Sequence, residues 1–150
     1  MRKSTLIMLF CLIGFNSFAQ EENIIALGSE VTFTLSKTIG DGFTYKVTAI
    51  KQFNKNKVII TDDVLKDRAD TDQVKLYFCK GKFGNDTKTL LIIKNGLKVS
   101  LKYNAKIKVG GKDYFENTSV EPLFPNVKSI EEWPYNIDEI SLSDFSVMTD

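Results

Sequence analysis

The chain lacks histidine altogether, and this absence excludes several kinds of catalytic site in its 150 residues. Nucleophilic catalysis of the Ser-His and Cys-His types uses an imidazole base, and many zinc sites use imidazole ligands. Neither arrangement is open to this chain. The remaining options are carboxylate chemistry, a Ser/Lys pair, or binding without catalysis.

Long hydrophobic runs are also missing, apart from one near the N-terminus at residues 6–15. Arg2 and Lys3 precede this run, and small residues occupy the −3 and −1 positions of a cleavage site after Ala19. These are the features of a secretory signal peptide. The leader resembles those of proteins that Gram-negative bacteria export.

The apolar run is about half as long as the roughly 20 residues that a transmembrane helix needs, so an uncleaved anchor is the less favoured interpretation. We therefore expect residues 1–19 to be a cleaved signal peptide and residues 20–150 to form a single domain. The mature protein would then be periplasmic or secreted, without an integral membrane segment.

Cysteine is almost as scarce as histidine, since only Cys11 and Cys79 occur and the first lies in the leader. A single thiol makes neither an intramolecular disulfide, nor a thiolate zinc site, nor a Cys-x-x-Cys redox centre. We expect Cys79 to be a buried thiol, with pairing between chains or a reactive role as the alternatives.

Neither sign of charge predominates, because 20 Lys and Arg residues face 19 Asp and Glu residues. Loss of Arg2 and Lys3 with the leader lowers the formal net charge from +1 to −1. A domain without a basic excess lacks the electrostatic footprint of nucleic-acid binding. The sequence thus predicts no nucleic-acid partner, and we predict no cofactor.

What the chain does contain is strand periodicity, clearest at residues 97–109, where apolar and polar residues alternate without a break. Such alternation gives a strand one buried and one wet face. Residues 89–93 are almost continuously apolar, which is typical of a central strand covered on both faces. Asn95-Gly96 between the two runs predicts a tight hairpin. Because 13 alternating residues exceed the usual strand length, we expect a bend near Asn104 or a strand shared between two sheets.

Similar patterns predict an antiparallel hairpin between residues 30–37 and 43–53, and a last strand at residues 137–147 with a bulge before Phe145. Further strands are expected at residues 21–28, 57–61, 73–80 and 112–120. The charged segment 62–72 is interpreted as a loop that crosses between sheets, and residues 129–132 as one helical turn that begins with a capping box.

About seven to eight strands at this spacing indicate an all-β fold. The prediction is a single antiparallel β-sandwich with an immunoglobulin-like layout.

Aromatic residues supply the candidate ligand-binding site. Trp133 and Tyr135 flank Pro134 in an irregular segment before the last strand. Aromatic rings on a loop at the end of a sandwich stack on sugars or anchor protein partners. For Trp133 the favoured interpretation is that it folds back and closes the open end of the core.

Carboxylates supply the weaker candidates. Asp67, Asp70 and Asp72 fall within six residues and offer oxygen ligands for Ca²⁺. The glycine of an EF-hand loop is missing, however, and a solvated loop is the favoured interpretation. The adjacent acidic pairs Glu131-Glu132 and Asp138-Glu139 could serve glycoside hydrolysis only if the fold separates two carboxyl groups suitably, and surface charge is the favoured interpretation.

Together these features favour an exported, non-catalytic binding module for a protein or a glycan. An inhibitor or immunity-type protein that blocks an enzyme is the first alternative, because a small rigid exported domain suits that role. A hydrolase that uses carboxylates is the second.

Overall fold

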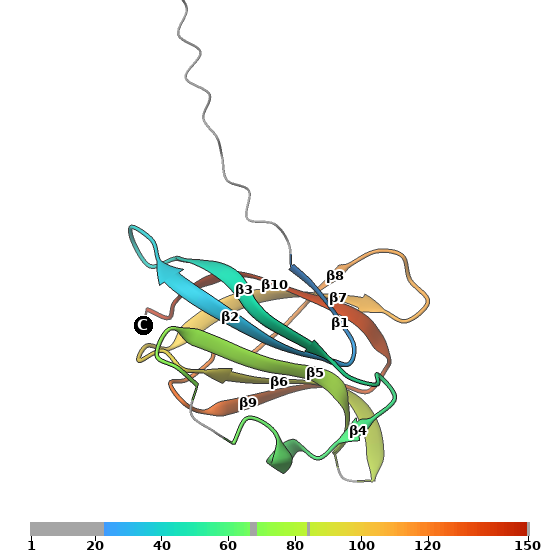
Figure 1. Ribbon diagram of the computed structural model, residues 1–150. Helices are drawn as coiled ribbons and strands as arrows, with labels where there is room; N and C mark the ends of the chain where they lie inside the picture. The colour runs from blue at the N-terminus through green and yellow to red at the C-terminus, as the bar shows by residue number, and fades with distance from the viewer. Residues whose placement is uncertain (1–22, 67–68, 84, 150) are drawn as a thin grey trace, which may run out of the picture.

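Ten β-strands and one short 3₁₀ turn make up the computed structural model within the residues that it describes, which are 23–66, 69–83 and 85–149 (Figure 1). The predicted signal peptide and Asp67 lie outside these residues. The elements are β1 (Asn23–Ala26), β2 (Ser29–Lys37), β3 (Phe43–Gln52), β4 (Val58–Ile59), η1 (Thr61–Asp63), β5 (Gln73–Phe83), β6 (Asp86–Asn95), β7 (Leu101–Val109), β8 (Glu116–Thr118), β9 (Lys128–Trp133) and β10 (Ile137–Val147).

The strands form two sheets that pack face to face. The larger sheet has the order β3-β2-β5-β6-β9, with β4 added in parallel beside β5, and the smaller sheet has the order β1-β10-β7-β8. All other pairings are antiparallel. The predicted antiparallel β-sandwich is therefore confirmed.

The main core lies between the sheets and follows the alternation of the sequence. In β2 and β5 every second side chain points inward and is buried, among them Phe33, Leu76 and Phe78. Phe145 stacks on Tyr103 at 5.8 Å between ring centroids and meets Tyr45 edge-on at 5.3 Å. Such aromatic contacts add to the free energy of burial.

Several local predictions are confirmed. The hairpin of β2 and β3 pairs from Ser29↔Gln52 to Lys37↔Phe43, with one register shift between Thr32 and Phe33. The bulge in β10 occurs between Ser143 and Ser146, where Asp144 has a φ of 55°.

The predicted hairpin at Asn95-Gly96 is wrong. Strand β6 pairs with β5 and β9 in the larger sheet, whereas β7 pairs with β10 and β8 in the smaller one. A type I′ turn needs φ > 0 at both central residues, and neither Asn95 nor Gly96 has it. Residues 96–100 instead form a corner between the sheets.

Asn95 stabilises this corner with its side chain. Its Oδ1 accepts the Leu97 N–H at 2.9 Å, and its Nδ2 donates to the carbonyls of Val99 and Leu123 at 2.8 and 3.1 Å. Asn95 is fully buried, so these bonds satisfy groups that have no access to water. The Asn95 side chain therefore stabilises the corner where the chain passes from the larger sheet to the smaller one, and not a two-residue turn.

Two further predictions are also wrong. The Ser129–Glu132 segment lies in β9 and not in a helical turn, because its backbone completes the ladder along β6. The charged segment 62–72 does not cross between sheets, because it joins β4 to β5 within the larger sheet. Its first half lies instead over the outer face of that sheet.

This covering segment creates a second, outer apolar cluster. Ile59 and Val64 pack there against Cys79, Leu90 and Ile92, all of them buried. Strand β6 is thus covered on both faces, as its continuous apolar run predicts, and the prediction of a buried Cys79 is confirmed. Burial raises the pKa of the Cys79 thiol to about 12.

Candidate functional site

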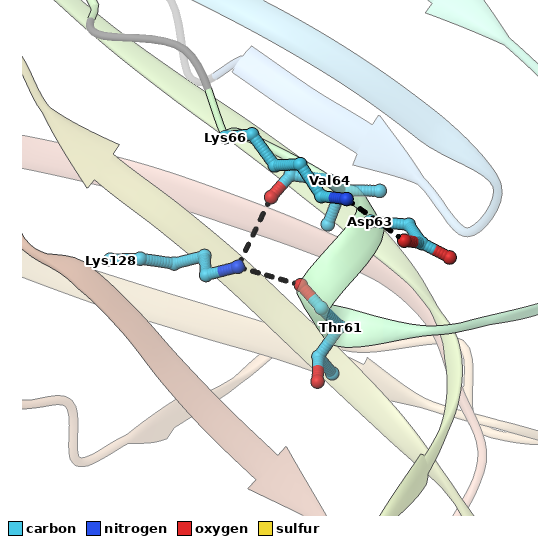
Figure 2. A network of polar contacts seen from close by, with 5 residues as sticks. All are labelled: Thr61, Asp63, Val64, Lys66 and Lys128. Atoms are coloured by element: carbon cyan, nitrogen blue, oxygen red, sulfur yellow. Dashed lines mark hydrogen bonds and ion pairs between the residues drawn. The ribbon is translucent and has the colours of Figure 1, made fainter.

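Two lysines hold the covering segment in place. Lys128 of β9 donates through Nζ to the carbonyl oxygens of Thr61 at 2.7 Å and Val64 at 3.2 Å (Figure 2). Lys94 of β6 donates to the carbonyls of Leu65 at 3.2 Å and Lys66 at 3.4 Å. We call residues 61–66 the strap, because their backbone is tied across the outer face by these bonds.

The lysines belong to a row that runs across three neighbouring strands. Lys75 lies opposite Lys94, and Lys94 lies opposite Lys128. Like charges that face each other across strands destabilise a sheet. The carbonyl oxygens of the strap offset this repulsion, so the charge pattern of the sheet itself favours the covered state.

A pocket of about 400 Å³ opens between the strap and the uncovered half of the larger sheet. We call it the outer pocket. Glu30 of β2 and Tyr77 of β5 line it from the sheet, and Phe53, Ile60 and Val64 contribute apolar surface. A neighbouring hollow of about 350 Å³ shares Glu30, Val64 and Tyr77 and extends the pocket toward the lysine row.

Glu30 and Tyr77 form a hydrogen-bonded pair in this pocket. The Tyr77 hydroxyl donates to Glu30 Oε2 at 2.7 Å, and the Tyr77 ring lies 5.9 Å from that of Phe53. Burial, followed by the bond to Glu30 and its negative charge, raises the pKa of Tyr77 to about 12. The phenol therefore stays protonated at neutral pH, where it acts as a hydrogen-bond donor that orients the carboxylate.

Lysines complete the rim of the outer pocket. Lys51 lies directly across the strands from Glu30, and Lys57 lies in the turn before β4. Within the described part of the chain, neither lysine comes within 4.0 Å of a carboxylate. The pocket thus presents charged groups of both signs whose bonding capacity is not used up by the protein.

A larger hollow of about 540 Å³ lies beside the bulge of β10. Its acidic group is Asp144, whose Oδ2 accepts from Asn104 Nδ2 at 2.8 Å and from the Ser143 hydroxyl at 2.9 Å. These polar groups bond to one another, and the lining offers little apolar surface. The outer pocket is therefore the better candidate site.

The two aromatic residues proposed from the sequence lie in different surroundings. Trp133 is only 6% exposed, belongs to the main core, and donates through Nε1 to Thr118 Oγ1 at 3.1 Å. Its placement agrees with the favoured interpretation of Trp133 as a core plug. Tyr135 is 45% exposed in the loop after β9, so a ligand-binding role for this residue stays a prediction.

The candidate Ca²⁺ ligands do not form a metal-binding group within the described residues. Asp67 lies outside the described residues, and Asp70 and Asp72 are exposed, with their carbonyls accepting from the N–H groups of Gln73 and Leu35. No group of three or more metal-ligating side chains is found in the part of the chain that the structure describes.

The acidic pairs mostly serve local bonds. Glu131 accepts the Glu121 N–H at 2.7 Å, and Glu132 pairs with Lys88 at 2.8 Å. Glu139 pairs with Lys108 at 3.2 Å. Burial raises the pKa of the half-buried Glu131 carboxyl.

Sequence reasoning missed the outer pocket, although one signal was present. Tyr77 and Cys79 fall on the face of β5 that alternation assigns to solvent. Two adjacent apolar positions on a predicted wet face indicate that something covers that face. The covering segment itself is highly charged, and it lacks the regularly spaced apolar residues that would predict packing against the sheet.

Comparison with protein-family models found no match, and comparisons with curated proteins and with solved structures found no significant similarity. Among the described residues, no helix has the length and apolar character needed to cross a membrane.

Proposed function

We propose that this chain is an exported, non-catalytic binding module whose ligand occupies the outer pocket. The observation that carries the proposal is the make-up of this pocket. Apolar and aromatic surface from Phe53, Ile60 and Tyr77 surrounds a few polar groups, chiefly Glu30 and Lys51. Concave sites of about 300–1,000 Å³ with this composition are typical of small-molecule and cofactor binding.

The chemistry of the pocket favours binding over catalysis. A general base accepts a proton near neutral pH, and Tyr77 is held in its protonated form by its raised pKa. One oxygen of Glu30 already accepts the Tyr77 hydroxyl. The arrangement orients a carboxylate for hydrogen bonding, and the absence of histidine removes the commonest catalytic base.

The leader supports the exported location. Expression of the full chain in a bacterium with a general secretion pathway tests this part of the proposal. Mass spectrometry of the envelope fraction should find a protein that begins at Gln20. A cytoplasmic protein that keeps its leader would refute export.

A pocket-blocking variant tests the binding role. Ile60 is 67% exposed at the pocket, so Ile60→Glu should fold normally while placing a charge against the apolar lining. The matched control is Ile24→Glu, because Ile24 is 55% exposed on β1 of the other sheet. The probe is 1-anilinonaphthalene-8-sulfonate, an aromatic sulfonate that reports binding by fluorescence.

We expect the Ile60→Glu variant to bind the probe about tenfold more weakly than the unmodified protein, and the Ile24→Glu variant to bind it unchanged. Chemical shifts in a nuclear magnetic resonance titration should change at Phe53, Ile60 and Tyr77. If the probe binds with no difference between the two variants, or if the shifts cluster elsewhere, the outer pocket is not the ligand site.

A further inference from the structure

The outer pocket holds charged groups of opposite sign that lie close together without pairing. Glu30 and Lys51 are directly opposite on β2 and β3, where side chains lie about 4.5–5.5 Å apart at Cβ. The Glu30 carboxylate nevertheless bonds to Tyr77 and leaves its second oxygen free, while the Lys51 ammonium has no carboxylate within 4.0 Å among the described residues. A ligand must therefore meet both an acceptor and a donor.

This requirement separates the classes of ligand. A purely apolar molecule would bury these charged groups without hydrogen-bond partners, which is unfavourable. An anion would be repelled by the Glu30 carboxylate, and a cation would be repelled by the ammonium groups of Lys51 and Lys57. A hydroxyl group satisfies both needs, because it donates to the carboxylate and accepts from the ammonium.

The charges of the pocket also balance. Its lining has two lysines, Lys51 and Lys57, and two carboxylates, Glu30 and Asp63, while Lys66, the ion-pair partner of Asp63, lies outside the lining. A site with little net charge offers no net attraction to an anion or to a cation. A ligand without net charge is therefore favoured, and its hydroxyl groups would meet both the carboxylate and the ammonium.

The apolar part of the site fits the same class. Phe53 and Tyr77 offer ring surface, with an angle of 35° between the ring planes. Aromatic rings pack against the C–H faces of sugar rings, while the hydroxyl groups at the ring edge reach polar partners. Ring surface beside paired donors and acceptors is the combination that a neutral sugar requires.

The uncovered strands beyond the pocket continue this polar character. Thr34 and Thr48 bring their hydroxyl oxygens to 3.2 Å from each other across β2 and β3. Thr48 also donates to the Thr32 carbonyl at 3.3 Å. A chain of sugars that leaves the pocket along these strands would therefore meet the hydroxyl groups of Thr34 and Thr48.

We infer that the outer pocket binds a neutral glycan, with the Glu30 carboxylate and the Lys51 ammonium bonding to its hydroxyl groups and Phe53 and Tyr77 packing against its ring. The inference rests on the proposed binding role of the pocket and adds the class of ligand. The volume of about 400 Å³ accommodates a short segment of the glycan and not a long chain.

The test uses the purified protein and three sets of probes: immobilised neutral oligosaccharides of varied composition, a library of short peptides, and 1-anilinonaphthalene-8-sulfonate. We expect at least one neutral oligosaccharide to bind, and Ile60→Glu to abolish this binding while Ile24→Glu preserves it. Affinity should change less than about twofold between low and high salt, because screening affects charged ligands far more than neutral ones.

Glu30→Gln sharpens the test. The variant keeps an acceptor oxygen and the size of the side chain but loses the charge and the strong acceptor, so glycan affinity should fall about tenfold. Binding of the anionic sulfonate probe should be unchanged or stronger in the same protein. This opposite response is one that a merely misfolded variant would not give.

The possible outcomes separate the two proposals. Binding of the sulfonate probe or of peptides at the outer pocket, without binding of any neutral oligosaccharide, overturns the glycan inference and leaves the binding role intact. Failure of all three sets of probes to bind at this pocket overturns the binding role as well.

Discussion

Lys94 and Lys128 lie directly opposite each other on β6 and β9, and both donate to carbonyl oxygens of one short segment, the strap. Two like charges in this position repel each other. The carbonyl oxygens of the strap offset this repulsion, and the strap at the same time forms one wall of the outer pocket. The sheet therefore contributes to the shape of the pocket through residues that do not line it.

Replacing Lys128 tests this relationship. Lys128→Met removes the donor to Thr61 and Val64, and we expect the unfolding free energy to fall by about 1–3 kcal/mol. Amide hydrogen exchange should increase in the strap, where the Asp63 N–H bonds to the Ile60 carbonyl. Lys102→Met is the matched control, because Lys102 is exposed on β7. Equal exchange in the two variants would show that Lys128 does not hold the strap.

The thiol of Cys79 should report opening of the strap. It is fully buried in the outer cluster, and its pKa of about 12 leaves very little thiolate at pH 8. We expect Ellman's reagent to leave the native protein unmodified and to react at once after unfolding in guanidinium. The reaction should be measurably faster in the Lys128→Met variant than in the Lys102→Met control. A rapid reaction of the native protein would contradict burial under the strap.

Alkaline pH should destabilise the fold through Tyr77. Its pKa is raised from 10.0 to about 12, so its contribution to stability is complete below pH 10 and is lost as the pH rises from about 10 to 12. The Tyr77→Phe variant should therefore lose less unfolding free energy across this interval than the unmodified protein. Tyr114→Phe, at an exposed position, is the control and should follow the unmodified curve. Parallel curves for all three proteins would show that Tyr77 is not the group responsible.

Trp133 should behave as a core residue. Trp133→Ala is expected to lower the unfolding free energy by about 3–5 kcal/mol, because it leaves a large cavity between the sheets. Thr118→Val removes only the acceptor of the indole N–H and should cost about 1 kcal/mol. Both values follow from urea denaturation monitored by circular dichroism. If Trp133→Ala leaves stability unchanged, the indole is not part of the core.

Gly96 marks a close approach of backbones at the corner after β6. A Cβ atom there would collide with the Asp70 carbonyl oxygen and would come within 2.8 Å of the Ala69 side chain. Gly110→Ala is a matched control, because the nearest atoms to its Cβ would lie at 3.5 Å. Gly96→Ala should lower the thermal midpoint markedly and Gly110→Ala only slightly. Equal midpoints would mean that the corner tolerates a side chain.

The same glycine shows why the sequence predicted strands better than their partners. Alternation identifies the buried positions of β2, β5 and β7, because a side chain must point to one face or the other. Nothing in that pattern says which sheet a strand joins. The Asn95-Gly96 pair carries the local signature of a hairpin, but the Asn95 side chain bonds to Val99 and Leu123, which lie 4 and 28 residues away. The contact with Leu123 spans too much of the chain to carry a local signal.

The candidate site was harder to predict for a related reason. Glu30, Phe53 and Tyr77 come from three separate segments, and only the pairing of β2 with β5 brings the first and last together. One wall of the pocket is the strap, a charged segment that is held through its backbone carbonyl oxygens. Because every residue has such an oxygen, the sequence of the strap does not reveal these bonds. Trp133, which the sequence did single out, is buried for the reason that made it conspicuous: it is the largest apolar side chain of the chain.

Strand β10 has a consequence for the order in which the protein acquires its shape. It lies between β1 and β7, so it joins the earliest described strand to the middle of the chain. During synthesis, β1 therefore has no partner in the smaller sheet and stays separate from β7 and β8 until residues 137–147 emerge. All strands of the larger sheet have emerged by then, because β9 precedes β10 in the chain. The inner faces of both sheets thus stay exposed until the end, and a chaperone that holds the unfinished chain would meet them throughout that interval.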